Sequence, residues 1–511
     1  MDNRLQPLPL VLSSRFCCYL RREVRQVNLL IKNVIVLFVA LCSFLAAEVA
    51  YSEQYYVSKA GSDSNDGLSP SSAWLTIQHA AQNLVAGDTV YVDEGVYSEP
   101  DPVPPSTQWW GIRPKNSGTS DSPIVFKAVE GKSVVIDNNM QAPCFTIYGV
   151  EYVEIRGFEL RNCQFAGVWI QSGSVSRNYG ISVVGNHIHT IDGPSGTNVG
   201  GIRADRVGKA YIANNLIHDI RVGGDMAKEN GAGVHSYRMW EVTIENNEIY
   251  NAANGIYYKY PDDESRGNTI IRKNYFHDTI LDAIQLSNND TAPGHHVDNV
   301  ISQNIVYNCG GFYDDDTYQS SVQANGLKIF NNTVVNSGGI EVRGTKNVEI
   351  YNNIFYGVST NIQKGLDLAQ SPAFRTIYSS VIFTNPTKRY GPSIKYTDHN
   401  LAYPLFSVQA GLYYSAEEEV FQNLSAWRSA LALKPYRGMD MDVQSNAESS
   451  SIEGDPKFYN VVGGNFRLMP DSPARGAGKN GSDLGAYPNR NDKIGIPDEL
   501  APCPPMTNAD C

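Results

Sequence analysis

The sequence predicts an all-β fold, a right-handed parallel β-helix with a helical cap at its N-terminal end. Three observations predict it. A unit of about 20–30 residues recurs along the middle of the chain, which indicates a solenoid. Each copy alternates apolar and polar residues, as strands do and helices do not. One short amphipathic segment, residues 76–84, precedes the repeats and is expected to be the capping helix.

Residues 1–50 have the features of a signal peptide region. A basic stretch at residues 21–32 precedes an apolar run at residues 34–47. That run has 14 residues, too few to span a bilayer and suited to the apolar part of an export signal. Small residues follow, and cleavage is expected near Ala50. We therefore expect a secreted protein, extracellular or periplasmic, without a stable membrane span once the signal is removed.

Residues 51–100 are predicted to form the N-terminal cap and the first coil. A strand is expected on each side of the capping helix, with turns at residues 61–67 and at Gly87 and Asp88. The helix would cover the open end of the solenoid. Bare strand edges at that end would otherwise invite association with other chains.

Residues 101–390 are predicted to form the coils of the β-helix. Val, Ile and Leu on one face of each strand must point into the core. An Asn stacked at the same turn of every coil can hydrogen-bond along the stack and satisfy buried backbone groups. The residue that marks this turn recurs at Gly157, Asn186, Asn215, Asn247, Asn274, Asn304, Asn332 and Asn353.

The C-terminal part is predicted to be less regular. Residues 391–490 are expected to form the last coils together with an irregular excursion that includes a helix at residues 424–433. Residues 491–511 are expected to form a tail.

The cysteines can form disulfides if the chain is exported. Cys144 and Cys163 could bridge neighbouring coils, and Cys503 and Cys511 could close a loop in the tail. Cys309 is left over and is expected to be a buried structural thiol.

The charge of the chain limits its partners. The formal net charge is −12 at pH 7. Such an acidic surface argues against nucleic acid as a partner, because clustered Lys and Arg are needed to bind phosphates. An acidic polysaccharide would need a local basic groove on this chain. We expect the protein to be a monomer.

The second strand of each unit can be aligned on a small residue, and its outward positions then form a column. In the segments GVWIQ, GIRAD, GVHSY, GIYYK, AIQLS, GFYDD and GIEVR, the second and fourth residues are mostly apolar and face the core. The third and fifth must face outward. Aromatic rings beside polar groups are typical of a sugar-binding groove. The expected substrate-binding residues are Trp169, Tyr257, Gln285, Tyr313 and Arg343.

Four further outward residues are the candidates for catalysis. Arg203, His235, Tyr237 and Lys259 fall on three successive coils, and adjacent coils lie about 4.8 Å apart. The outward residues of a solenoid are also simply solvent-facing, and polar types are expected there. Both interpretations stay open for each residue taken alone, whereas the column as a whole favours a binding site.

Two segments outside the repeats add to the pattern. YYVSKAGSDSNDGLSPSSAWLTIQHAAQNLVAGDTVYVDEGVYSE, residues 55–99, is similar to the entry segment of secreted β-helix proteins, and NFRLMPDSPARGAG, residues 465–478, to their closing segment. Together with the repeats they resemble the pectate-lyase-like superfamily of right-handed parallel β-helices over residues 53–490. Within it, the chain resembles polysaccharide lyases of the family-nine pectate lyase and chondroitinase B types. The resemblance implies extracellular glycan processing.

The first choice that this resemblance implies is a lyase that cleaves an acidic, uronic-acid polysaccharide by β-elimination. A base removes the proton beside the carboxylate, and a positive charge or metal neutralises the acid group. Lys259 is the candidate base, Arg203 or His235 would neutralise the carboxylate, and Tyr237 would protonate the leaving oxygen. Burial or the nearby arginine must then lower the pKa of Lys259.

Calcium is possible, and no other cofactor is implied. The lyases that the chain resembles hold calcium with a cluster of carboxylates near their lysine. The segment NGAGVHSY, residues 230–237, does not match that cluster. Family-nine pectate lyases also have their lysine at the third position of the strand, where this chain has Tyr257. No metal ligand is therefore assigned.

Two other functions remain open. A glycoside hydrolase needs two carboxylates about 5–9 Å apart across a cleft. Asp315 and Glu341, on adjacent coils, could supply them. A solenoid without catalysis could bind glycan, or act at a surface, through the same outward residues. Loss of binding without loss of any product on mutating Tyr257 or Trp169 would favour that function.

Overall fold

The computed structural model divides the chain into two units, Met1–Tyr51 and Ser52–Cys511. The residues that the structure describes belong to the second unit, so the predicted signal peptide lies outside them. They are 52–102, 109–173, 178–259, 267–287, 296–315, 324–342, 345–358, 381–383, 394–404, 408–411, 418–433, 441–489 and 491–496. Only the backbone is described at 102, 109, 313–315, 381–383, 408–411, 418, 420, 441, 442 and 444.

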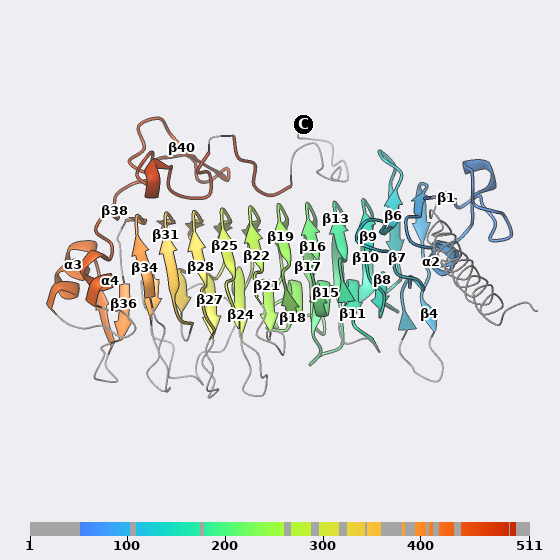
Figure 1. Cartoon of the computed structure of the whole chain (residues 1–511), viewed down its shortest axis with the longest axis horizontal. Coiled ribbons are helices and arrows are strands. Elements are labelled where there is room, and N and C mark those ends of the chain that lie inside the picture. Colours follow the sequence, from blue (N-terminus) through green and yellow to red (C-terminus); the bar gives the residue numbers. More distant parts are fainter. Residues whose placement is uncertain are drawn as a thin grey trace, which may run out of the picture. The chain divides into compact units, whose positions relative to one another are not determined.

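Three long sheets, each of twelve strands among the described residues, form the coils (Figure 1). In each sheet a strand pairs in parallel with the equivalent strand of the next coil, which confirms the predicted parallel β-helix. The first sheet contains, in stacking order, β1 (Gln54–Val57), β2 (Thr89–Val92), β6 (Ile124–Ala128), β9 (Val153–Arg156), β13 (Ser182–Val184), β16 (Tyr211–Ala213), β19 (Thr243–Glu245), β22 (Ile270–Arg272), β25 (Val300–Ser302), β28 (Lys328–Phe330), β31 (Val348–Tyr351) and β34 (Ile394–Asp398).

The second sheet follows the first by a short corner in each coil. It contains β3 (Gly95–Tyr97), β7 (Val134–Asp137), β10 (Glu159–Gln164), β14 (His187–Asp192), β17 (Leu216–Ile220), β20 (Glu248–Tyr250), β23 (Tyr275–His277), β26 (Ile305–Tyr307), β29 (Thr333–Val335), β32 (Ile354–Tyr356), β35 (Leu401–Tyr403) and β38 (Ile452–Glu453).

The third sheet carries the predicted column of outward residues. It contains β8 (Phe145–Tyr148), β11 (Ala166–Gln171), β15 (Val199–Gly208), β18 (Gly231–Trp240), β21 (Asn254–Lys259), β24 (Ile284–Ser287), β27 (Phe312–Asp315), β30 (Ile340–Val342), β33 (Val381–Phe383), β36 (Val408–Gly411) and β37 (Glu418–Phe421), with β12 (Asn178–Tyr179) beside β15. The pair β36–β37 is antiparallel, as is the separate pair β4 (Asp101–Pro102) and β5 (Trp109–Trp110).

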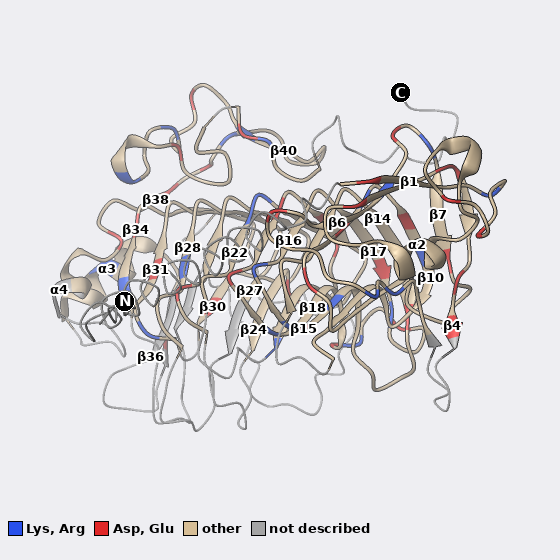
Figure 2. Ribbon diagram, turned by 45° about the vertical axis from the view of Figure 1, so that its right-hand side comes forward, with Lys and Arg blue, Asp and Glu red and all other residues tan. Residues whose placement is uncertain are grey.

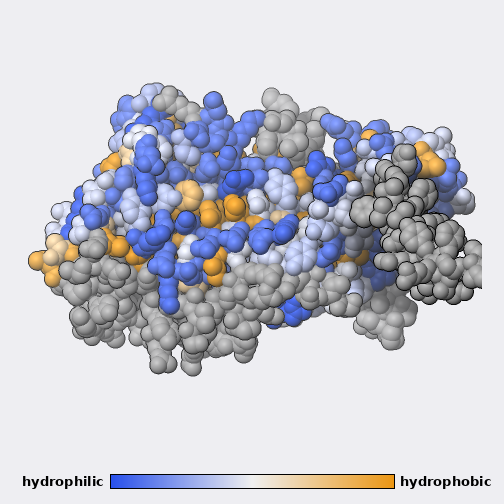
Figure 3. Space-filling view, in the orientation of Figure 1, coloured by the Kyte–Doolittle hydropathy of each residue, from blue (hydrophilic) through white to orange (hydrophobic). Residues whose placement is uncertain are grey.

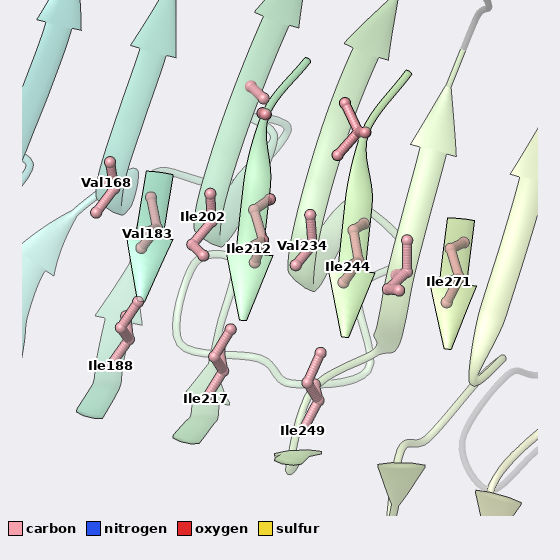
Figure 4. Close-up of a cluster of buried hydrophobic side chains, with 14 of the residues drawn as sticks. Val168, Val183, Ile188, Ile202, Ile212, Ile217, Val234, Ile244, Ile249 and Ile271 are labelled. Carbon is pink, nitrogen blue, oxygen red and sulfur yellow. The ribbon is translucent and has the colours of Figure 1, made fainter. Parts of the chain in front are cut away.

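The interior is filled by stacks of aliphatic side chains, one from each sheet in each coil (Figure 4). Alternation along each strand places one apolar residue inside at every coil. The stacked residues are 0–1% exposed. They include Val168, Ile202 and Val234 from the third sheet, Val183, Ile212, Ile244 and Ile271 from the first, and Ile188, Ile217 and Ile249 from the second.

The predicted asparagine stack is present at the corner between the first and second sheets. Each backbone N–H donates to the Oδ1 of the Asn in the next coil at 3.0–3.1 Å, and Nδ2 donates to the same oxygen. The members are Asn186, Asn215, Asn247, Asn274, Asn304, Asn332, Asn353 and Asn400. The first marker, Gly157, is not one of them: Val184 pairs with Arg156, so Gly157 lies opposite Gly185, one residue earlier.

The cap at the N-terminal end agrees with its prediction. The helix α2 spans Ile77–Asn83, with the Thr76 side chain accepting from the backbone N–H of His79. Two carboxylates hold its first turn. Asp63 accepts from the backbone N–H groups of Leu75 and Thr76, and Glu99 from those of Ile77 and Gln78. Charged carboxylates at a helix N-terminus satisfy its unpaired N–H groups. A short 3₁₀ helix, η1 (Pro70–Ser72), precedes α2.

In the C-terminal part, β34 and β35 continue the stacked sheets. The predicted helix is α3 (Leu424–Leu433), and α4 (Met441–Asn446) follows it. The last described segment, with the hairpin β39 (Phe458–Asn460) and β40 (Asn465–Leu468) and the short η3 (Lys479–Gly481), packs on the second sheet. Figure 3 shows a largely hydrophilic described surface with smaller apolar areas.

Two of the three cysteine predictions are confirmed, and the third lies outside the described residues. Cys144 and Cys163 form a disulfide with Cα atoms 5.5 Å apart. Cys309 is a buried free thiol, and burial raises its pKa to about 12. Cys503 and Cys511 lie outside the described residues. Among the described helices, none is long and apolar enough to cross a membrane.

Candidate functional site

The predicted column is present on the third sheet, in the predicted alignment. Parallel pairing joins Trp169 to Arg203, Arg203 to His235, His235 to Tyr257, and Tyr257 to Gln285. The backbone pairing continues to Tyr313 and Glu341. A second line, two residues further along each strand, joins Gln171, Asp205, Tyr237, Lys259, Ser287 and Asp315.

Among the described residues of the column, five side chains are buried. Trp169 and Lys259 are each 8% exposed, Tyr257 is 4% exposed and His235 is 0% exposed. Gln285 is also buried. The expectation that outward residues of a solenoid are simply exposed is therefore wrong for this part of the column. Side chains of adjacent coils pack on one another here, and residues of two preceding loops contact them.

Lys259 lies among uncharged partners. Its Nζ donates to Asn230 Oδ1 at 2.5 Å and to Asn198 Oδ1 at 3.3 Å. Its Nζ also lies 4.3 Å from the centre of the Tyr257 ring. Burial, with a smaller contribution from Arg203, lowers the pKa of Lys259 to about 8, against an opposing effect of Glu229. About a tenth of the amine is therefore neutral at pH 7, and about half of it at pH 8.

Arg203 provides a positive charge next to the lysine. Its guanidinium stacks over the ring of Trp169 at 4.7 Å, and its Nη1 donates to the backbone carbonyl of Asn198 at 2.9 Å. The side chain keeps partial exposure, as do Asp205 and Tyr237. These three residues are the more exposed members of the cluster, and they lie on β15 and β18.

His235 is fully buried between Arg203 and Tyr257, its neighbours in the adjacent coils. Its ring lies 5.3 Å from that of Tyr237 and 5.4 Å from that of Tyr257. Neither ring nitrogen has a hydrogen-bond partner among the described residues. Burial, followed by the charges of Lys259 and Arg203, lowers the pKa of His235 well below its usual value. A neutral imidazole can donate one hydrogen bond to a ligand, but it brings no charge to a carboxylate.

Three residues of the site were not predicted from the sequence: Asn198, Glu229 and Asn230. Asn198 contacts three of the four catalytic candidates, since its Nδ2 also donates to the Tyr237 hydroxyl oxygen at 2.7 Å. Glu229 accepts a hydrogen bond from the Tyr257 hydroxyl at 2.9 Å. Two signals were in the sequence: the segment 218–230 predicts a long loop beside the column that could wall a cleft, and Asn198 and Asn230 each lie directly before a strand of the third sheet.

Two predicted binding residues, Tyr313 and Arg343, and one carboxylate of the candidate hydrolase pair, Asp315, have no described side chain. The side chains of Tyr313 and Asp315, and the whole of Arg343, lie outside the described residues. Their backbone pairing places Tyr313 beside Glu341 and Asp315 beside Ser287. The candidate hydrolase pair, Asp315 and Glu341, thus falls on adjacent coils as predicted, and its carboxyl separation is not described.

The described residues around Lys259 do not offer the carboxylate ligands that calcium prefers. Calcium prefers six to eight oxygen ligands, including several carboxylates. Among the described residues there is no group of three or more His, Cys, Asp or Glu side chains that could hold a metal ion. The amide oxygens of Asn198 and Asn230 already accept from the lysine, and Glu229 accepts from Tyr257. Figure 2 shows Lys and Arg interspersed with Asp and Glu over the coils.

Comparison with known proteins agrees with this fold. The family description "Pel9A-like, right handed beta helix region" matches residues 55–391, more than half of the chain. The chain belongs to the Pel9A-like right-handed β-helix family. The handedness predicted for the solenoid is therefore confirmed, together with the pectate-lyase-like resemblance.

Individual relatives of this Pel9A-like chain are distant. An uncharacterized protein of Bacillus subtilis, YwoF, is 25% identical over 473 residues, covering 84% of this chain and 94% of the relative. Pectate lyase PEL9 of Emericella nidulans is 26% identical over 261 residues, covering 46% of this chain and 57% of the relative. The crystal structure of pectate lyase Pel9A is 14% identical with a TM-score of 0.51, covering 86% of this chain and 97% of that chain. At that identity the structural likeness shows the fold.

Proposed function

We propose that this Pel9A-like protein is a polysaccharide lyase that cleaves an acidic, uronic-acid polysaccharide by β-elimination. The observation that carries the proposal is Lys259, a buried lysine with a pKa of about 8, with the more exposed Arg203 in the same cluster. A base and a fixed positive charge are the two groups that this elimination needs. The similarity to pectate lyase PEL9 supports the same reaction class.

The roles follow from position. Lys259, in its neutral form, takes the proton on the carbon beside the uronate carboxylate. Arg203 pairs with that carboxylate and stabilises the negative charge that develops on it. Tyr237 donates its phenol proton to the glycosidic oxygen as the carbon–oxygen bond breaks. The electron pair of the broken carbon–hydrogen bond forms the new double bond, so no water is consumed.

The surrounding residues would bind the sugar. Trp169 and Tyr257 would contact it through the small part of their rings that is exposed, and Gln285 and Tyr313 continue the column along the following coils. Arg343, the last predicted binding residue, lies outside the described residues. A polysaccharide lies naturally across stacked coils, because successive coils repeat the same surface at a fixed spacing. We propose that the protein acts as a secreted monomer, extracellular or periplasmic, with polysaccharide as its partner.

The test is ultraviolet absorbance of the unsaturated uronide while the purified protein is incubated with pectate, alginate or chondroitin. The proposal expects the absorbance to rise with at least one of them and to stay flat with the Lys259→Ala protein. New reducing ends without absorbance would replace it with a hydrolase and direct attention to Asp315 and Glu341. Binding to all three polymers without either product would replace it with a non-catalytic glycan-binding solenoid.

A further inference from the structure

The amine of Lys259 is held by two amide oxygens that come from outside its own strand. Asn198 ends the loop before β15, and Asn230 ends the loop before β18. Val199 pairs with Gly231, so the two asparagines occupy equivalent places in adjacent coils. Both Oδ1 atoms accept from Lys259 Nζ, one at 3.3 Å and the other at 2.5 Å.

The direction of the Asn198 amide is fixed by its other contacts. Its Nδ2 donates to the Tyr237 hydroxyl oxygen at 2.7 Å, so Oδ1 is the end that faces the lysine. Its backbone carbonyl accepts from Arg203 at 2.9 Å. One residue therefore fixes the distances between the proposed base, the proposed acid and the arginine.

A neutral amine has two N–H bonds and one lone pair. If each of two acceptors takes one N–H group, the lone pair of the amine points away from both of them. An amide oxygen can only accept, so neither asparagine competes with the substrate proton for that lone pair. A carboxylate in either place would instead favour the ammonium form, which has no lone pair.

We propose that Asn198 and Asn230 are positioning residues that orient the lone pair of Lys259 toward the substrate proton, with Asn198 also placing Tyr237. The inference rests on the proposed lyase function. It explains why a lysine with two polar partners can act as a base, since those partners are uncharged acceptors. In this proposal the two loop asparagines do not contact the substrate; they act through Lys259 and Tyr237.

The experiment compares Asn230→Asp, Asn198→Asp and Asn230→Ala with the unchanged protein. The pKa of Lys259 is measured without substrate by NMR of its side-chain carbons, and kcat/KM for elimination is measured across pH. We expect each aspartate variant to raise both the NMR pKa and the apparent pKa of the rate by about one unit or more. Activity near pH 7 then falls about tenfold and recovers at higher pH.

Asn230→Ala separates positioning from charge. It removes an acceptor without adding a charge, so we expect kcat to fall about tenfold or more at every pH, without the alkaline shift. Asn83→Asp, on the exposed face of α2, is the matched control and should change neither value. Equal thermal stability of the variants shows that they are folded.

The outcomes separate this inference from the proposed function. Aspartate variants with the pKa of Lys259 unchanged, or an alanine variant with full kcat, would overturn the positioning role while the lyase function stands. No elimination by the unchanged protein on any uronate polymer would refute the proposed function and with it this inference. The NMR titration would still show whether the asparagines contact the amine.

Discussion

At the scale of single residues, Lys259 shows how surroundings decide chemistry. The side chain meets two amide oxygens and the faces of two phenol rings. No carboxylate of the described residues forms an ion pair with it. Burial removes water from the ammonium group of Lys259, and no carboxylate in contact compensates for this loss. The charged form is therefore destabilised, and the pKa of Lys259 falls. His235, next to it, loses its proton for the same reason and because two cations are near.

Replacing Lys259 should abolish elimination. We expect Lys259→Ala to lower kcat/KM by about a hundredfold or more, because general-base catalysis typically contributes that much. Ultraviolet absorbance of the product measures the rate. Lys209→Ala, at an exposed lysine, is the control and should keep full activity. Retained activity in the Lys259 variant would assign the base to another residue.

The rate should depend on pH with the sign of a base. The reactive form of Lys259 is the neutral amine, and its pKa is lowered to about 8. We expect kcat/KM to rise about tenfold per unit below that pKa and to level off above it. Initial rates between pH 6 and about 9.5 would measure this. A profile that falls over the same range would contradict a lysine base.

Activity should not require calcium. The residues around Lys259 offer two amide oxygens, both already used, and Arg203 supplies a positive charge in the same cluster. We expect kcat/KM to change less than twofold in excess chelator, and calorimetry to show no calcium bound in the absence of substrate. Activity lost with chelator and restored by calcium would mean that the metal ligands lie outside the described residues.

At the scale of elements, the asparagine stack explains why the corner between the first and second sheets repeats so closely. A short corner leaves backbone N–H and C=O groups turned into the interior, where no strand can pair them. Each Asn fills that place, and its Nδ2 also donates to a backbone carbonyl, as Asn274 does to Ile244 at 2.9 Å. The stack ends at Asn400, whose backbone N–H donates to Ser451.

Breaking the stack in its middle should be costly. Asn274→Ala removes the Oδ1 that accepts from the buried N–H of Asn247, and it removes the Nδ2 that donates to the carbonyl of Ile244 and to Asn304 Oδ1. We expect the free energy of unfolding to fall by about 3 kcal/mol, since each unsatisfied buried group costs about 1–3 kcal/mol. Denaturant unfolding would measure it, with Asn83→Ala as the exposed control. A loss no larger than that of the control would show that the stack contributes little.

At the scale of the whole molecule, the C-terminal segment completes the coils. Phe458, Phe466 and Leu484 pack against Ile305 and Ile354, which lie on the outer side of the second sheet. The segment then continues along the stack. Polar contacts hold it there, such as Lys273 with Asp492 at 3.1 Å and the N–H of Gly495 with the carbonyl of Lys273 at 2.9 Å. An apolar surface that would otherwise face water is thereby covered.

Removing this segment should destabilise the protein. A chain that ends at Asp455 exposes Ile305, Val335 and Ile354, and we expect a lower unfolding temperature and binding of a hydrophobic dye. A chain that ends at Ile496 keeps every described contact and is the matched control. Unchanged stability of the shorter chain would show that the segment is dispensable.

The site residues on strands could be predicted from the sequence, whereas those in loops could not be assigned one by one. Lys259, Tyr237, His235 and Arg203 were found because strands alternate strictly, so a small residue in each unit fixes which side chains face outward. Asn198, Glu229 and Asn230 were not assigned individually, because loop residues follow no period. Their contact with Lys259 depends on how each loop returns to its strand.

The sequence by itself determined the parallel β-helix, the asparagine stack and the outward column, and it offered Cys144 and Cys163 as a possible disulfide. Each of these is a repeated or local consequence of strand geometry and burial. Only the tertiary structure decided that the column is buried around Lys259 and that His235 is neutral. Both depend on desolvation, and desolvation is set by which groups from other coils and loops surround a side chain.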